Sequence, residues 1–114
     1  MTRAMGRRAV LAANLALAAA ILPAAPAAAQ AAKGAATEGE RLFREHGCYG
    51  CHTLGKMGTP IAPDLSKVGA KHNAAYFVNW LKDPSSQRPT AHMPAIKMTD
   101  AEAQALAAFL SSQR

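Results

Sequence analysis

The sequence has little cysteine, few aromatic side chains and few acidic residues. Its 114 residues include 2 cysteines, which excludes a framework of several disulfides and a four-cysteine zinc site. Aromatic residues make up 5% of the chain, so a core built from side chains alone would be modest. Acidic residues number 7 against 13 lysines and arginines, yet no basic stripe interleaved with aromatic residues is present. The positive charge therefore does not predict nucleic-acid binding.

The chain also lacks an apolar run long enough to span a bilayer. The longest run, Ala9–Leu22, has 14 residues, whereas a spanning helix needs about 18–20. Arginines at positions 3, 7 and 8 precede it, and Ala27-Ala28-Ala29 follows it. This order predicts a secretory signal peptide over residues 1–29, cleaved after Ala29, and a periplasmic location. Cleavage after Ala31 and an uncleaved anchor are the alternatives.

Removal of residues 1–29 would leave one small domain and no transmembrane span. Residues 30–114 keep ten basic and seven acidic residues, which gives a net charge of about +3. The alanine-rich segment 30–36 is expected to be a flexible leader, followed by a domain over residues 37–114. A domain of this size usually needs a covalent or metal staple.

Helical patterns dominate residues 37–114. Thr37 and Glu40 have the spacing of a capping box and predict a helix over about residues 38–46, ended by Gly47. Asn73 is expected to cap a second helix over residues 74–82, stopped by Asp83-Pro84. The third helix is expected to begin at Thr99, where Glu102 completes a second capping box. No strand-like alternation is visible, so an all-α fold is predicted.

Two proline- and glycine-rich stretches separate these helices. Residues 53–69 predict a loop with several turns, and residues 83–98 contain three prolines and no usable periodicity. Sixteen residues without regular structure are uncommon in so small a domain unless the loop has a function.

The segment Cys48-Tyr49-Gly50-Cys51-His52 has the pattern of covalent haem attachment. Two thiols three positions apart lie on one side of the chain and can form thioethers to two vinyl groups on one haem edge. The adjacent His52 can then bind the iron from the proximal side. A disulfide, a thioredoxin-like dithiol and half of a zinc site are the alternatives. The dithiol is disfavoured because no βαβ pattern surrounds it, and zinc because four ligands are not at hand.

Taken in order, the motifs resemble those of the monohaem class I cytochromes c. The resemblance runs from about Thr37 to the end of the chain and rests on these residues: Gly39 and Phe43; Cys48-Tyr49-Gly50-Cys51-His52; Ala62-Pro63-Asp64-Leu65; Trp80-Leu81; Met93-Pro94; Phe109-Leu110. It implies a small cytochrome c fold, with three main helices and loops around one covalently bound haem c. It further implies that the first and last helices cross near Gly39, with Phe109 against them.

The resemblance also implies roles for two residues near the haem. The Pro63 carbonyl would accept the N–H of the His52 imidazole and fix its tautomer. The indole N–H of Trp80 would bond a haem propionate.

Met93 is the predicted second axial ligand. It lies in the proline-rich loop, well beyond His52 in the sequence, and matches the Met-Pro of the resembled family. Met57 is too close to His52 to reach the opposite face of a haem. Met98 and His92 are the alternatives, whereas His46 and His72 are expected to be solvated or capping residues.

A haem held by His52 and Met93 predicts a small electron carrier or an electron-transfer subunit of an oxidoreductase, either monomeric or within a complex. The alternatives are a peroxidase-like enzyme with a labile sixth ligand and a sensory or structural haem module. Five lysines are expected around the haem edge, where they would attract acidic redox partners or serve as ordinary surface charge. These are Lys56, Lys67, Lys71, Lys82 and Lys97.

Overall fold

A computed structural model describes residues 12–23 and 26–114. In this part of the chain the α-helices are α1 (Ala27–Glu45), α2 (Ala74–Lys82), α3 (Pro84–Gln87) and α4 (Asp100–Ser111). Two 3-10 turns, Cys48–Gly50 and Val68–Ala70, and a short antiparallel pair, β1 (Thr53–Leu54) and β2 (Met57–Gly58), complete the fold. The predicted all-α architecture is confirmed, with three longer helices and the one-turn helix α3.

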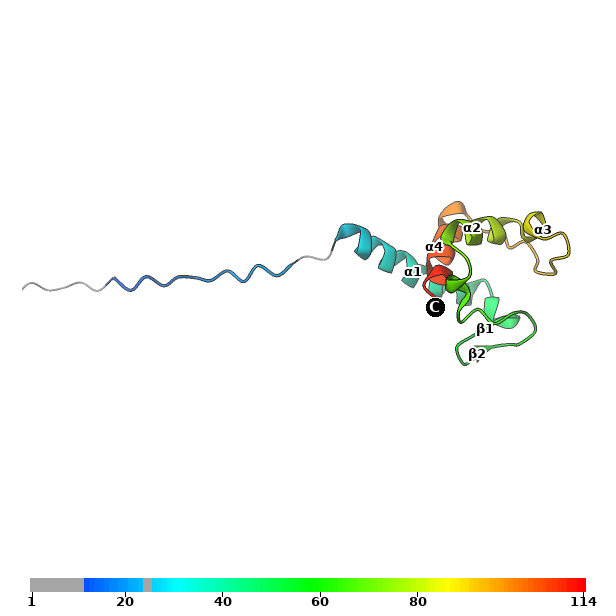
Figure 1. The fold of residues 1–114 in the computed structure, drawn as a ribbon, viewed down its shortest axis with the longest axis horizontal. Coiled ribbons are helices and arrows are strands. Elements are labelled where there is room, and N and C mark those ends of the chain that lie inside the picture. Colours follow the sequence, from blue (N-terminus) through cyan, green and yellow to red (C-terminus); the bar gives the residue numbers. More distant parts are fainter. Residues whose placement is uncertain (1–11, 24–25) are drawn as a thin grey trace, which may run out of the picture.

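The core lies where α1, α2 and α4 meet. In Figure 1, α4 crosses the C-terminal half of α1, with α2 and α3 on one side of the crossing and the hairpin of β1 and β2 on the other. At Gly39 a Cβ atom would overlap the carbonyl oxygen of Ala105 and would lie 2.6 Å from Cβ of Phe109. The predicted close crossing at Gly39 is therefore confirmed. The buried apolar side chains are Leu42, Phe43, Phe77, Leu81, Ala103, Ala105, Leu106, Ala107, Phe109 and Leu110.

The predicted start of the first helix is wrong. Helix α1 begins at Ala27, and Thr37 lies inside it, where its hydroxyl donates to the Lys33 carbonyl (3.0 Å) instead of capping the helix. Alanine is the best helix former, so the segment before Thr37 continues the helix. The expected flexible leader 30–36 is thus helical, and α1 projects from the body at its N-terminal end (Figure 1).

The predicted signal peptide is described only in part. Residues 12–23 have neither helix nor strand and are exposed, and the arginines at positions 3, 7 and 8 lie outside the described residues. Cleavage at Ala29 stays a prediction. Among the described residues, no helix combines the length and apolarity that a membrane crossing requires.

The caps of the other two long helices are as predicted. The Asn73 side chain accepts from the Tyr76 N–H (2.9 Å) at the start of α2. At the start of α4, the Thr99 N–H donates to the Glu102 carboxylate (2.8 Å) and the Glu102 N–H donates to the Thr99 hydroxyl (3.2 Å). Asp83 does end α2, but it also caps α3, because Pro84 is suited to the first position of a helix.

Candidate haem-attachment site

The attachment segment follows directly on the end of α1. Gly47 has a φ of 73° and turns the chain out of the helix, which an L side chain would disfavour. Cys48–Gly50 then form a 3-10 turn, and the His52 N–H donates to the Cys48 carbonyl (2.9 Å). One compact turn therefore holds both cysteines and His52.

The two cysteines are free and differ in exposure. Cys48 is half-buried against the core, and this burial raises the pKa of its thiol above the usual value. Cys51 is exposed. The two cysteines are therefore not joined in a disulfide in this structure. One thiol lies at the core and the other at the surface.

His52 is oriented by the loop that resembles the family motif. Its Nδ1 atom lies 2.7 Å from the carbonyl oxygen of Pro63. A carbonyl can only accept, so Nδ1 carries a proton, and in the neutral ring Nε2 keeps its lone pair. The contact that the resemblance implied for Pro63 is present, and it leaves His52 in the tautomer that binds a metal through Nε2. Its role toward a haem stays a prediction.

The Pro63 loop is hydrogen-bonded to the attachment segment and to the chain that follows it. The Ala62 N–H donates to the Cys51 carbonyl (2.7 Å), and the Gly55 N–H donates to the Ser66 hydroxyl (2.8 Å). Ser66 in turn donates to Asp64 through its hydroxyl (2.6 Å) and its backbone N–H (2.9 Å). These two bonds, the hydroxyl first, hold the pKa of the Asp64 carboxyl below its usual value. Asp64 thus fixes the loop whose carbonyl orients His52.

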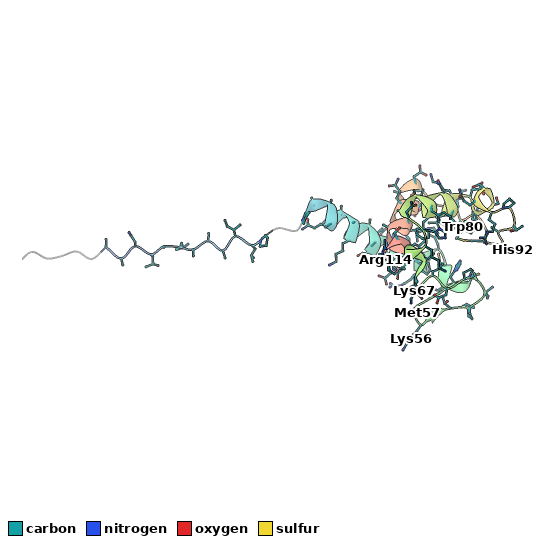
Figure 2. The ribbon with its side chains drawn as sticks, viewed as in Figure 1. Lys56, Met57, Lys67, Trp80, His92 and Arg114 are labelled. Carbon is teal, nitrogen blue, oxygen red and sulfur yellow. The ribbon has the colours of Figure 1, made fainter. Side chains whose placement is uncertain are left out.

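Met93 is half-buried and packs against the core from the loop before α4. Its sulfur accepts from the indole N–H of Trp80, with Nε1 and Sδ 3.2 Å apart. Trp80 was expected to bond a propionate, but its donor is directed to the thioether. Figure 2 shows Trp80 and His92, the neighbour of Met93, on one side of the molecule, and Lys56 and Met57 on the hairpin side.

The other candidate ligands lie in less favourable settings. Met57 is 59% exposed on β2, His92 is exposed, and Met98 is half-buried beside the start of α4. His72 was expected to be solvated or to cap a helix; it is half-buried, Asn73 rather than His72 caps α2, and its ring stacks on Tyr76 with centroids 3.7 Å apart. His46 was expected to be solvated or to cap a helix. It caps the end of α1 through its backbone, and its Nε2 atom is buried rather than solvated.

The described residues fit a c-type haem by their chemistry. They provide two free thiols, an imidazole with one nitrogen held as a donor, and a thioether, which is a soft metal ligand. Partly buried apolar side chains pack on the core as well, and they offer apolar surface of the kind that a porphyrin requires. They include Tyr49, Leu54, Leu65, Val68 and Val78. By contrast, no three histidine, cysteine or acidic side chains in residues 12–23 and 26–114 are grouped as a metal site would require.

One feature of the site was not predicted from the sequence. Tyr76 and Trp80 of α2 form an aromatic stack with His72, which precedes the helix; the rings of Tyr76 and Trp80 are 6.1 Å apart and inclined by 18°. The spacing of four residues places Tyr76 and Trp80 on one face of α2, and this spacing could have predicted their contact.

Comparison with known proteins agrees with this geometry. The sequence model of one family, Cytochrome c, matches residues 36–114. A curated relative, cytochrome c oxidase subunit 2 of Alkalihalophilus pseudofirmus, is 34% identical over 86 residues; the match covers 68% of this chain and 25% of that protein. The chain therefore spans about a quarter of the length of this relative.

A solved structure has the same fold. The c-type cytochrome SorU from Sinorhizobium meliloti superposes with a TM-score of 0.56 at 25% identity, covering 71% of this chain and 92% of that one. Together with the family match and the attachment segment, this supports haem-based electron transfer rather than catalysis. The chain belongs to the cytochrome c family.

Proposed function

We propose that this chain is a periplasmic electron-transfer protein with one haem c, bound through Cys48 and Cys51 and ligated by His52 and Met93. The observation that carries the proposal is the contact between His52 Nδ1 and the Pro63 carbonyl (2.7 Å). Neither a disulfide nor a dithiol requires this contact, whereas a histidine that binds a metal through one nitrogen usually donates from the other to such a carbonyl.

Each ligand is prepared by its own part of the fold. The turn after α1 and the Pro63 loop direct the His52 imidazole, whereas α2 directs the Met93 thioether through Trp80. A haem held between an imidazole and a thioether supplies one-electron chemistry at a raised potential. Because both axial positions would be filled by side chains, a substrate would have no ready position, and this favours a carrier over a peroxidase-like enzyme.

Location and partners belong to the same proposal. The signal-like residues 1–29 support export to the periplasm. The relative named as a cytochrome c oxidase subunit supports a role within or beside a respiratory oxidoreductase. We favour a small carrier or an electron-transfer subunit of such a complex.

The charge distribution supports an acidic docking partner. On α1 the carboxylates are paired within the helix, Glu38 and Glu45 with Arg41, and Glu40 with Arg44. Lys82 pairs with Asp100, so it contributes little to a basic ring. The other four lysines of the predicted ring are exposed: Lys56, Lys67, Lys71 and Lys97. Figure 2 shows Lys56 and Lys67 toward the hairpin side. Steering by such charges raises association rates and weakens with salt.

Absorption spectra test the ligand assignment. Protein matured in a host that attaches haem is expected to show a methionine-to-iron charge-transfer band in the ferric state. The ferrous state is expected not to change on addition of carbon monoxide. Met93→Ala should abolish the band and admit carbon monoxide, whereas the control Met98→Ala should keep the band. Rapid carbon monoxide binding by the unsubstituted protein would favour the peroxidase-like alternative.

A further inference from the structure

Met93 has no regular secondary structure of its own to orient it. The only turn-forming hydrogen bond within residues 88–98 joins the Ala91 N–H to the Arg88 carbonyl (2.9 Å). A methionine side chain has three rotatable bonds and adapts easily to irregular surroundings. A thioether that must present one lone pair in a fixed direction therefore needs a second contact.

Trp80 provides that contact from a rigid position. Helix α2 is capped by Asn73 and anchored in the core by Phe77 and Leu81, which are 3% and 4% exposed. Trp80 extends from this helix, and Tyr76 stacks on its ring at an inclination of 18°. Its indole plane is thus held by packing, and its N–H reaches Met93 Sδ at 3.2 Å.

A thioether sulfur has two lone pairs, so it can accept one hydrogen bond and still bind a metal with the other. An N–H donor on the sulfur draws electron density away from it and makes it a weaker ligand. When a haem is bound, the weaker thioether would stabilise ferric iron less than ferrous iron, because the higher charge depends more on electron donation from the sulfur. The hydrogen bond therefore favours the reduced state while it keeps the thioether in place.

We infer that Trp80 is a positioning residue for Met93, whose N–H···S hydrogen bond restrains the axial thioether and raises the reduction potential. This inference rests on the proposed ligation by Met93. It replaces the propionate contact expected for Trp80 with a contact to the ligand itself.

Trp80→Phe tests the inference, because it keeps an aromatic ring on Tyr76 and removes the N–H. The net strength of one neutral hydrogen bond corresponds to about three- to tenfold in an equilibrium. The variant is therefore expected to have a potential lower by about 30–60 mV, which is that change at 59 mV per tenfold for one electron. Its ferric form should bind added imidazole about three- to tenfold less tightly, because a thioether without the N–H donor is the stronger competing ligand. Its methionine-to-iron band should persist at a shifted wavelength.

The control is Tyr76→Phe, which keeps the stack and removes a hydroxyl group one helical turn away. It is expected to leave the potential and the imidazole affinity unchanged. An equal change in both variants, or no change in Trp80→Phe, would overturn the inference. A separate result would show that the ligand proposal is wrong: the methionine-to-iron band would be unchanged in Met93→Ala. That result would overturn the role of Trp80 as well.

A measurement on the unsubstituted protein decides the matter if Trp80→Phe does not take up haem. The chain has 1 tryptophan, so its indole N–H gives one assignable signal in the NMR spectrum of the ferrous protein. A nuclear Overhauser effect between this proton and the Met93 methyl group is expected. Absence of that effect, with the N–H close to a haem propionate instead, would contradict the inference.

Discussion

At the scale of single residues, the close approach of α4 to α1 requires a glycine at position 39. The α4 backbone occupies the space that a side chain at this position would need. Gly39→Ala is expected to lower the free energy of unfolding by about 1–3 kcal/mol, because the two helices must move apart. Chemical denaturation followed by circular dichroism measures this difference. The matched control is Gly34→Ala in the same helix, where a Cβ meets nothing within 4 Å, and no loss of stability is expected. Equal stability of the two variants would contradict the crossing.

Asp64 gives the site a dependence on pH. Ser66 lowers the pKa of the Asp64 carboxyl from its ordinary 3.8, so the ionised form is favoured in the folded state. This contribution to stability is complete above pH 3.8 and is lost as the pH falls through the lower folded pKa. NMR titration of the carboxyl carbon is expected to give a pKa below 3.8 in the wild type and one closer to 3.8 in Ser66→Ala. Identical values in the two proteins would show that Ser66 is not the cause.

At the scale of elements, two threonines with the same local pattern behave differently. Thr99 caps α4 in a full capping box, whereas Thr37 lies within α1 and bonds back to Lys33. Thr99→Ala is therefore expected to lower the free energy of unfolding by about 1 kcal/mol. Thr37→Ala should cost nothing, because alanine is the better helix former at an exposed position. Thermal denaturation of both variants measures the contrast, and a larger loss for Thr37→Ala would refute these cap assignments.

This pair also shows how far the helices could be predicted. Helices α2 and α4 were predicted at their caps because Asn73 and Thr99 follow irregular chain, where a capping side chain has no competing helix. Thr37 follows a run rich in alanine, and the helix propensity of that run overrides the local capping pattern. Helix α3 and the β1–β2 pair were missed because one turn and two residues per strand produce no periodicity.

The site divides along similar lines. The attachment segment could be predicted because two cysteines at fixed spacing with an adjacent histidine form a short motif. The Pro63 contact could be predicted because Pro63 lies close to His52 in the sequence and belongs to the family pattern. The partner of Trp80 could not, because it depends on where the irregular loop bearing Met93 comes to lie against α2. The position of that loop depends on tertiary packing, which cannot be predicted from helical periodicity.

At the scale of the whole molecule, the uneven charge distribution predicts a salt-dependent reactivity. Electron exchange with anionic ferricyanide is expected to slow as ionic strength rises, because the lysines near the hairpin attract it. Lys56→Glu should slow the reaction at low salt several-fold. Lys33→Glu makes the same change in net charge at an exposed position of α1 and should have a smaller effect. Stopped-flow rates at two salt concentrations measure both, and equal effects would mean that only the net charge matters.

The central claim for the whole molecule is that a porphyrin is joined to the polypeptide at Cys48 and Cys51. Acidified-acetone extraction of the matured protein, followed by mass spectrometry, tests it most directly. We expect the colour to stay with the protein, whose mass should exceed that of the polypeptide by one haem. Cys48→Ser with Cys51→Ser should release the pigment. A wild-type protein that loses all its colour and has the mass of the bare polypeptide would contradict the claim.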